Sequence, residues 1–260
     1  MKRLLALFVL VAALCVPALS AGEELTVKVR TDVLSDYIFR GQVQNDSPVM
    51  QSEVKIERGI YSLRLWGNTD LTDRRESQLE FSEFNLDFKL EKAVYSNAKS
   101  KLLTAASLFG GVIYYSYPEI NRESTTELYA GVDATSLFDI HARVTVSYDV
   151  DEVDGGYVAA DLYKKLALPF SFNIGKSAFK VTARPEVGYG WGSNDYNRYY
   201  WGTRGSCLTD WHAGLAVMAE SERFEFGPSV KYTDLIDGDI QDQQNKSSNI
   251  VYGFSLGMKF

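Results

Sequence analysis

The chain has 260 residues, of which 45% are hydrophobic, and its 16 tyrosines suit membrane interfaces, where a ring is half exposed to water. Its 34 acidic residues outnumber its 27 basic ones, and the resulting net charge of −7 argues against binding to nucleic acid. With two histidines and two cysteines, a His/Cys metal centre is not expected, and we predict no cofactor.

The first segment, residues 1–21, has the layout of a secretory signal peptide. Two basic residues precede an apolar run from Leu4 to Val16, and small residues follow as far as Ala21. Beyond this segment, no stretch approaches the ~18 consecutive apolar residues of a membrane-spanning helix. We therefore expect export of one domain, residues 22–260, which can cross a membrane only as a β-barrel.

A strict alternation runs from Leu25 to Phe39. Odd positions are mostly apolar, while even positions carry Lys28, Arg30, Asp32, Asp36 and Arg40. A soluble strand usually has ~5–6 residues, whereas this one is long enough to cross an apolar band of ~25 Å when tilted. Charges on the inner face require water or partners, so the pattern predicts a polar interior and a lipid-facing exterior.

The end of this segment reads Ser35, Asp36, Tyr37, Ile38, Phe39, Arg40 and Gly41. This run resembles the opening strand and loop of the TorF-like porin family of bacterial outer-membrane β-barrels. The resemblance covers under a tenth of the chain and implies a barrel with a pore. From strand geometry, we expect Tyr37 and Phe39 to reach the outer aromatic girdle. Asp36 and Arg40 lie ~13 Å apart along such a strand, so each should pair with a neighbouring strand.

Period-two patterns predict eleven further strands. They are Val49 to Glu57, Ile60 to Asn68, Leu79 to Leu90, Leu102 to Tyr117, Leu128 to Ala134, Ile140 to Tyr148, Tyr157 to Leu168, Phe179 to Trp191, Leu208 to Ala219, Phe224 to Tyr232 and Asn249 to Phe260. The predicted fold is therefore all-β, a closed antiparallel up-and-down transmembrane β-barrel of about 12 strands. The even number places both termini on the periplasmic side.

Several irregularities accompany this pattern. The apolar parity changes within the third of these strands, which predicts a bulge near Ser82 or Glu83. Proline removes a ladder donor, so Pro185 and Pro228 should each mark a bulge or local irregularity. The longest connections fall on the outer side, as expected for this class. The inner connections, among them Pro169 to Ser177, are mostly short, and the longest of them, Ala93 to Lys101, fits this scheme poorly.

The last strand presents Tyr252, Phe254 and the terminal Phe260 on its apolar face. It resembles the terminal signal of bacterial outer-membrane barrels, which implies that these three residues are an assembly signal for the barrel-assembly machinery. On the opposite face of the wall, charged residues should pair across strands and give only mild selectivity. The predicted lumen-facing charges are Lys28, Arg30, Asp32, Asp36, Arg40, Glu53, Arg64, Asp139, His141, Arg143, Lys180, Arg184 and Glu186.

The long outer loop between Gly192 and Gly205 is the candidate constriction, with packing in the aromatic girdle as the alternative. Its ring-bearing and basic residues are Tyr196, Arg198, Tyr199, Tyr200, Trp201 and Arg204. Two acidic outer stretches, 149–155 and 234–242, lack the spacing of a calcium-binding loop and are predicted to be solvated. Weak bridging to lipopolysaccharide is the alternative for them.

Neither His141 nor His212 is followed two residues later by the serine that outer-membrane lipid hydrolases typically show, so no enzymatic activity is predicted. The sequence favours an outer-membrane porin or narrow channel for small polar solutes. Its expected partners are outer-membrane lipids, lipopolysaccharide, the barrel-assembly machinery and the solutes. A non-conducting structural or adhesive barrel, a lipid-active barrel enzyme and a secreted soluble sandwich are the alternatives.

Overall fold

The computed structural model describes residues 24–72, 81–100, 102–118 and 122–260. The predicted signal peptide lies outside the described residues, as do parts of the outer loops expected around 69–77 and 118–124 and the start of the strand expected from Leu79. Within the described ranges, no helix is long and apolar enough to cross a membrane.

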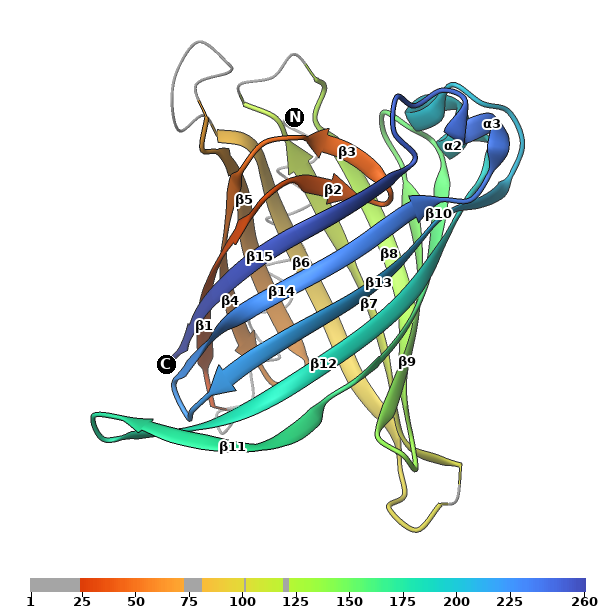
Figure 1. The fold of residues 1–260 in the computed structure, drawn as a ribbon. Helices are drawn as coiled ribbons and strands as arrows, with labels where there is room; N and C mark the ends of the chain where they lie inside the picture. The colour runs from red at the N-terminus through yellow and green to blue at the C-terminus, as the bar shows by residue number, and fades with distance from the viewer. Residues whose placement is uncertain (1–23, 73–80, 101, 119–121) are drawn as a thin grey trace.

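Twelve antiparallel strands close into a barrel, and a thirteenth, β11, is attached to it (Figure 1). The wall strands are β1 (Thr26–Leu34), β4 (Val49–Arg58), β5 (Tyr61–Asp70), β6 (Phe81–Ser96), β7 (Leu103–Ser116), β8 (Thr125–Ser136), β9 (Ile140–Asp149), β10 (Gly156–Lys164), β12 (Ser177–Gly192), β13 (Cys207–Glu220), β14 (Phe224–Leu235) and β15 (Ser248–Lys259). β1 pairs with β15, and β10 pairs with β12, skipping β11 (Leu166–Ile174). The predicted fold class is confirmed.

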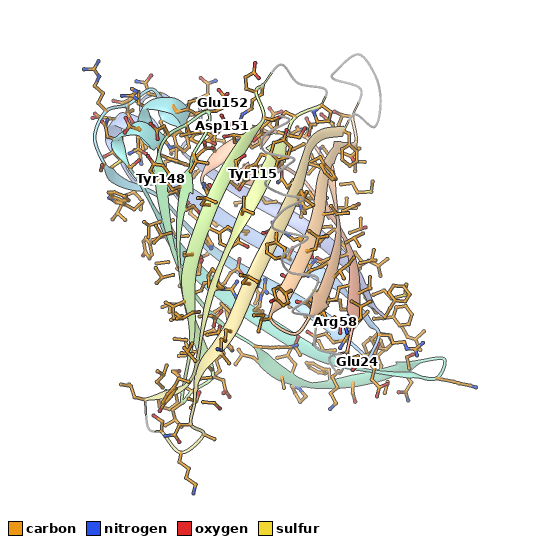
Figure 2. The ribbon with its side chains drawn as sticks, turned by 180° about the vertical axis from the view of Figure 1, so that it is seen from behind. Glu24, Arg58, Tyr115, Tyr148, Asp151 and Glu152 are labelled. Atoms are coloured by element: carbon orange, nitrogen blue, oxygen red, sulfur yellow. The ribbon has the colours of Figure 1, made fainter. Side chains whose placement is uncertain are left out.

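The two faces of the wall differ as the alternation predicts. On β15, Tyr252, Phe254 and Leu256 are more than half exposed on the outer face, while Asn249 and Ser255 are buried on the inner one. Figure 2 shows side chains projecting from both faces along the whole wall. A polar interior and an apolar exterior are stable together when the exterior contacts hydrocarbon.

The two ends of the barrel carry different connections. One short turn joins β4 to β5, where Gly59 has a φ of 57°, and another joins β8 to β9. Both turns lie at the end of the barrel that also holds Glu24 and Arg58 (Figure 2). Val27 and Phe260 exchange backbone hydrogen bonds at this end, so the first and last wall strands finish together. The helices α2 (Asn194–Trp201) and α3 (Gly238–Gln241) lie at the opposite end (Figure 1).

Two predicted inner connections are wrong because the strands continue into them. β6 runs to Ser96 and β7 begins at Leu103, so the first part of the link expected from Ala93 to Lys101, residues 93–96, is strand. The link expected from Pro169 to Ser177 is mostly β11, which turns only at Gly175. On β11 the exposed apolar residues Leu166, Phe170, Phe172 and Ile174 keep one even-numbered row on both sides of Pro169.

The predicted irregularities have different outcomes. The bulge near Ser82 is confirmed, because the register between β5 and β6 shifts there. Pro185 keeps its register with Leu215 on β13 and lies in the gap where β12 changes partner from β11 to β10. At Pro228 the pairing of β14 with β13 lapses without a register shift.

The first predicted strand ends five residues early, at Leu34. Ser35 exchanges two hydrogen bonds with the Tyr252 backbone, at 2.8 and 3.0 Å, and the chain then leaves the wall. Tyr37, expected in the lipid-facing girdle, is instead buried inside the barrel. It begins a two-stranded hairpin of its own, β2 (Tyr37–Phe39) with β3 (Gln42–Asn45).

Cysteine labelling can test which row of β1 contacts water. In a Cys207→Ser background, cysteines at Lys28 and Asp32 should react with a polar maleimide in reconstituted vesicles, because both positions face the lumen. Cysteines at Val29 and Val33, which are exposed on the outer face, should be shielded by lipid. Labelling of the valine row alone would show a soluble fold with an apolar core.

Candidate functional site

The β2–β3 hairpin enters the barrel from the end opposite the short turns (Figure 1). The Tyr37 hydroxyl donates a 3.0 Å hydrogen bond to Glu83 on β6, and its ring lies 5.7 Å from that of Trp66 on β5. Burial, and the neighbouring Glu83 carboxylate, raise the pKa of Tyr37 well above its usual range, so this hydroxyl remains a donor. The first residue of the hairpin is thus fixed to one side of the wall.

Arg40 occupies the tip of the hairpin and reaches another part of the wall. Its Nη1 and Nη2 each lie 2.8 Å from an oxygen of Glu127 on β8, and Nη2 is 3.4 Å from Ser147 on β9. The guanidinium also lies 4.4 Å above the ring of Tyr157. Burial disfavours the cation, but the facing Glu127 carboxylate holds the pKa of Arg40 well above its usual range. A bidentate pair of this kind fixes orientation as well as position.

Gly41 brings the hairpin against a third part of the wall. Its φ of +80° lies in the left-handed region, and a Cβ at this position would stand 2.7 Å from the Cβ of Asp210 on β13. Glycine is therefore required both by the turn and by the close approach. Since β6, β8 and β13 are distributed around the barrel, the hairpin crosses the lumen.

The return strand of the hairpin is held by polar contacts with the outer loops. Gln42 donates to the backbone oxygen of Tyr200 at 3.0 Å, and Arg122 donates to the side chain of Gln44 at 3.3 Å. Asn45 donates to Asp70 at the end of β5 at 2.8 Å. Both strands of the hairpin are thus anchored.

The loop predicted as the constriction folds as the helix α2 and supports the hairpin from outside the lumen. Its Tyr196 and Trp201 are buried, and the Tyr196 ring packs 5.1 Å from that of Tyr157. Among the described residues that line the three interior cavities, none comes from 193–205. The Tyr196 ring lies beside the Arg40 guanidinium, and the Tyr200 backbone accepts a hydrogen bond from Gln42. Arg198 pairs with Asp195, and Tyr199 and Arg204 face solvent.

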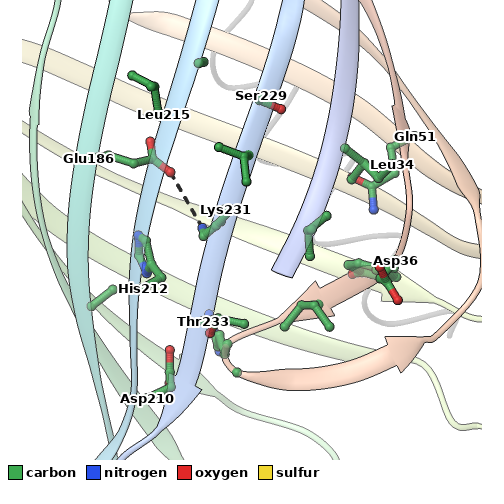
Figure 3. Close-up of a pocket in the computed structure, with 18 of the residues that line it drawn as sticks. Leu34, Asp36, Gln51, Glu186, Asp210, His212, Leu215, Ser229, Lys231 and Thr233 are labelled. Carbon is green, nitrogen blue, oxygen red and sulfur yellow. Dashed lines mark ion pairs between the residues drawn. The ribbon is translucent and has the colours of Figure 1, made fainter. Parts of the chain in front are cut away.

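Three interior cavities share lining residues and together follow the barrel from the hairpin to the short-turn end. The central cavity, shown in Figure 3, has a volume of about 490 Å³ and contains the Glu186–Lys231 pair. Arg40 and Ser147 also line a side cavity of about 370 Å³. Arg30 and Arg184 line both the central cavity and a lower cavity of about 500 Å³, which ends at the β13–β14 turn.

Ion pairs within single strands and between nearby strands cover the inner wall below the hairpin. They are Lys28 with Glu57, Arg30 with Asp32 and Glu225, Lys55 with Glu57, Arg64 with Glu53 and Asp87, Lys89 with Glu91, Arg143 with Asp133, and Arg184 with Glu186. Asp36 also lines the central cavity, although it lies beyond the end of β1. The arrangement leaves a polar, charge-paired surface around the cavities.

Two residues predicted to face the lumen lie elsewhere. Asp139 is exposed in the β8–β9 turn, where its φ is 55°, because β9 begins one residue later. Lys180 lies on the part of β12 that pairs with β11, and it lines none of the cavities found among the described residues. Both positions keep the predicted parity, but Asp139 lies in a turn, and Lys180 lies outside the stretch of β12 that pairs with β10.

His141 does not have the geometry of a general base in a catalytic triad. Its Nδ1 lies 3.2 Å from the Thr135 hydroxyl and 3.5 Å from the Asp133 carboxylate, so both partners face the same ring nitrogen. A proton relay requires the nucleophile and the orienting acid on different nitrogens. The ring also stacks on Tyr163, with centroids 4.7 Å apart, as a packed wall residue does.

His212 lies in the central cavity, where its Nε2 is 3.5 Å from Asp161 (Figure 3). Asp210, two residues earlier on the same face, accepts hydrogen bonds from Tyr157 and Thr209, and no contact with His212 is found among the described residues. The carboxylate that lies near this histidine therefore comes from β10 and was not identified by the sequence.

The acidic stretch at 149–155 uses its first carboxylate internally. Asp149 accepts hydrogen bonds from the backbone of Asp151 and Val153 and from the Thr125 hydroxyl. These bonds close the turn between β9 and β10. In the part of the chain that the structure describes, no three acidic, histidine or cysteine side chains converge as metal ligands would.

Sequence reasoning missed the acids that hold the hairpin. Glu83 and Glu127 both lie on inner faces, at the start of β6 and β8. The predicted strand from Leu128 to Ala134 omits Glu127, yet Glu127, Tyr129 and Asp133 continue the inner row by steps of two. This alternation, extended back to Glu127, is the sequence signal that could have identified that residue as lumen-facing.

Comparison with known proteins gives a family and a fold. Residues 19–252 match the family described as bacterial protein of unknown function (Gcw_chp). The chain belongs to this family. No curated protein matches it in sequence.

Among solved structures, this Gcw_chp chain is similar to LpxR from Salmonella typhimurium, with a TM-score of 0.50, 8% identity and coverage of 90% of this chain and 99% of that one. It is also similar to the NanC porin (TM-score 0.46, 12% identity, 90% and 100% covered). A third similar structure is the outer membrane channel DcaP of Acinetobacter baumannii (TM-score 0.39, 9% identity, 93% of this chain and 98% of that chain covered). At these identities the likeness concerns the fold alone.

Proposed function

We propose that this protein is an outer-membrane channel for the passive passage of small polar solutes. The observation that carries the proposal is the series of charge-lined cavities that follows the barrel axis from the hairpin to the short-turn end. Arg30 and Arg184 mark the boundary between the central and lower cavities. A lumen built only for stability would be filled by side chains, as in the smallest barrels.

The hairpin from Tyr37 to Asn45 acts as the constriction. It crosses the lumen above the central cavity and is held by contacts with several strands, so it sets the width of the path. The resemblance of residues 35–41 to the TorF-like porins supports a pore, although it assigns no role to the hairpin itself. The proposed location is the outer membrane, because the exterior is apolar and strands rather than helices would cross the bilayer.

On this proposal the chain is a channel rather than an enzyme. Outer-membrane lipids and lipopolysaccharide surround it, the barrel-assembly machinery inserts it, and small solutes pass through it. The position of both partners on one nitrogen of His141 supports the absence of catalysis. The histidines then serve as polar wall residues.

Planar bilayer recording tests the proposal directly. Purified full-length protein that migrates as a heat-modifiable barrel should produce discrete conductance steps, with little preference between potassium and chloride, because the inner-wall charges are paired. A barrel that inserts and yields no steps would refute the channel. The anchored hairpin would then be a plug, and the protein a structural or adhesive barrel.

A further inference from the structure

The β11–β12 hairpin pairs over residues 166–183 and differs in charge from the rest of the chain. Lys164 and Lys165 precede it directly, and it contains Lys176 and Lys180 and no acidic residue, although acids outnumber bases in the whole sequence. Lys165 pairs with Glu220, whereas Lys176 and Lys180 form no ion pair with any described residue. A basic segment within an acidic protein indicates an anionic partner.

The same hairpin has an exposed apolar face. Leu166, Phe170, Phe172 and Ile174 are between 38% and 63% exposed. Phe172 stacks on Phe179 at 5.4 Å, and Phe179 meets Phe226 on the outer face of β14. The apolar surface of the hairpin is therefore continuous with the apolar exterior of the barrel.

The hairpin projects sideways beyond the barrel at its short-turn end (Figure 1). Among the described residues β11 pairs with β12 alone, so its other edge carries backbone groups without a strand partner there. Such an edge is not stable in hydrocarbon, where unpaired backbone groups are costly. Pro169 lies on this edge strand and interrupts the register, as prolines that discourage edge pairing do.

We infer that the β11–β12 hairpin is a foot that binds the anionic phospholipid surface of the periplasmic leaflet, with its apolar row in the leaflet and its lysines at the phosphates. The inference depends on the proposed outer-membrane location. An apolar face beside lysines is the combination that holds amphipathic segments at a charged membrane interface. The free edge of β11 is compatible with that position, because water reaches the interface.

Lipid quenching in vesicles tests the foot. Full-length protein in a Cys207→Ser background carries an environment-sensitive dye at Ile174→Cys or, on the opposite face, at Asn173→Cys. In vesicles containing phosphatidylglycerol, brominated acyl chains should quench the dye at position 174 several-fold more than the dye at 173. Phosphatidylcholine alone should weaken the difference, as should the double substitution K176Q/K180Q. The charge-matched substitution of Lys99 and Lys246 by glutamine should leave it unchanged.

Other outcomes would overturn the inference. A dye at position 174 that remains in water in every vesicle would refute the foot, and conductance of the same sample would leave the channel intact. Strong quenching that is equal in both lipids would mean that charge has no role. Shielding without lipid quenching would indicate a second copy or another protein on this face. Failure to insert would refute the membrane location itself.

Discussion

Replacing residues 37–45 with a short Gly-Ser linker should raise the single-channel conductance several-fold, because this segment is the part of the chain that crosses the lumen. The point substitution Arg40→Ala should act in the same direction, since it removes both hydrogen bonds to Glu127. The wall strands contribute no residue to the hairpin sheet, so the barrel should still assemble. Conductance steps in planar bilayers and heat-modifiable migration on gels measure the two effects.

Arg198→Ala is the matched control for this experiment. Arg198 also lies in an outer connection, but its partner is Asp195 on the same helix, and its side chain is 61% exposed. Its removal should therefore leave the conductance unchanged. If the Arg198 and Arg40 substitutions gave equal effects, the constriction would not be the hairpin. If the linker variant conducted like the intact protein, the solute path would bypass residues 37–45.

The wall could be predicted because each wall strand meets two different solvents. Where one face contacts lipid and the other a polar lumen, every second residue is constrained, and the period is visible in single strands. The row Tyr252, Phe254 and Leu256 opposite Asn249 and Ser255 shows this on β15. The same rule placed the bulge at Ser82, because a change of parity within a strand requires an extra residue.

The end of β1 could not be predicted from the same rule. Tyr37 and Phe39 continue the odd apolar row beyond Leu34, so no local change of pattern marks the point where the chain leaves the wall. What holds them in the lumen are Glu83 and Glu127, which lie 46 residues from Tyr37 and 87 residues from Arg40. The alternation on the inner face of a strand is the same whether an acidic residue contacts water or contacts a loop that folds back into the lumen.

The candidate constriction was misplaced for a related reason. Rings and arginines between Gly192 and Gly205 have the composition of a pore-narrowing loop, but composition does not fix which loop is nearer the axis. In the structure, Ser193 caps α2 by accepting a hydrogen bond from the backbone of Tyr196, and the helix directs Tyr196 against Arg40. The aromatic loop thus supports the shorter first loop, whose hairpin we propose as the constriction.

The energy of the anchor can be measured by a double-mutant cycle. Glu127→Ala leaves the Arg40 guanidinium among aromatic rings without its carboxylate, and the two side chains are only 15% and 6% exposed. Breaking a buried pair on one side costs about 3 to 5 kcal/mol. We expect a loss of this order in the free energy of unfolding in urea, measured in detergent micelles. Arg40→Ala should also destabilise the protein, because it leaves a buried carboxylate.

The double variant Arg40→Ala with Glu127→Ala should lose less stability than the sum of the two single variants, because neither charge is then left unpaired. The exposed pair of Arg198 and Asp195, with an N–O distance of 2.9 Å, provides the matched cycle. Its coupling should be below about 1 kcal/mol, since both partners are solvated in either state. Additive losses at Arg40 and Glu127 would mean that the hairpin does not depend on this pair, and that Tyr37 and the loop contacts of β3 hold it in place.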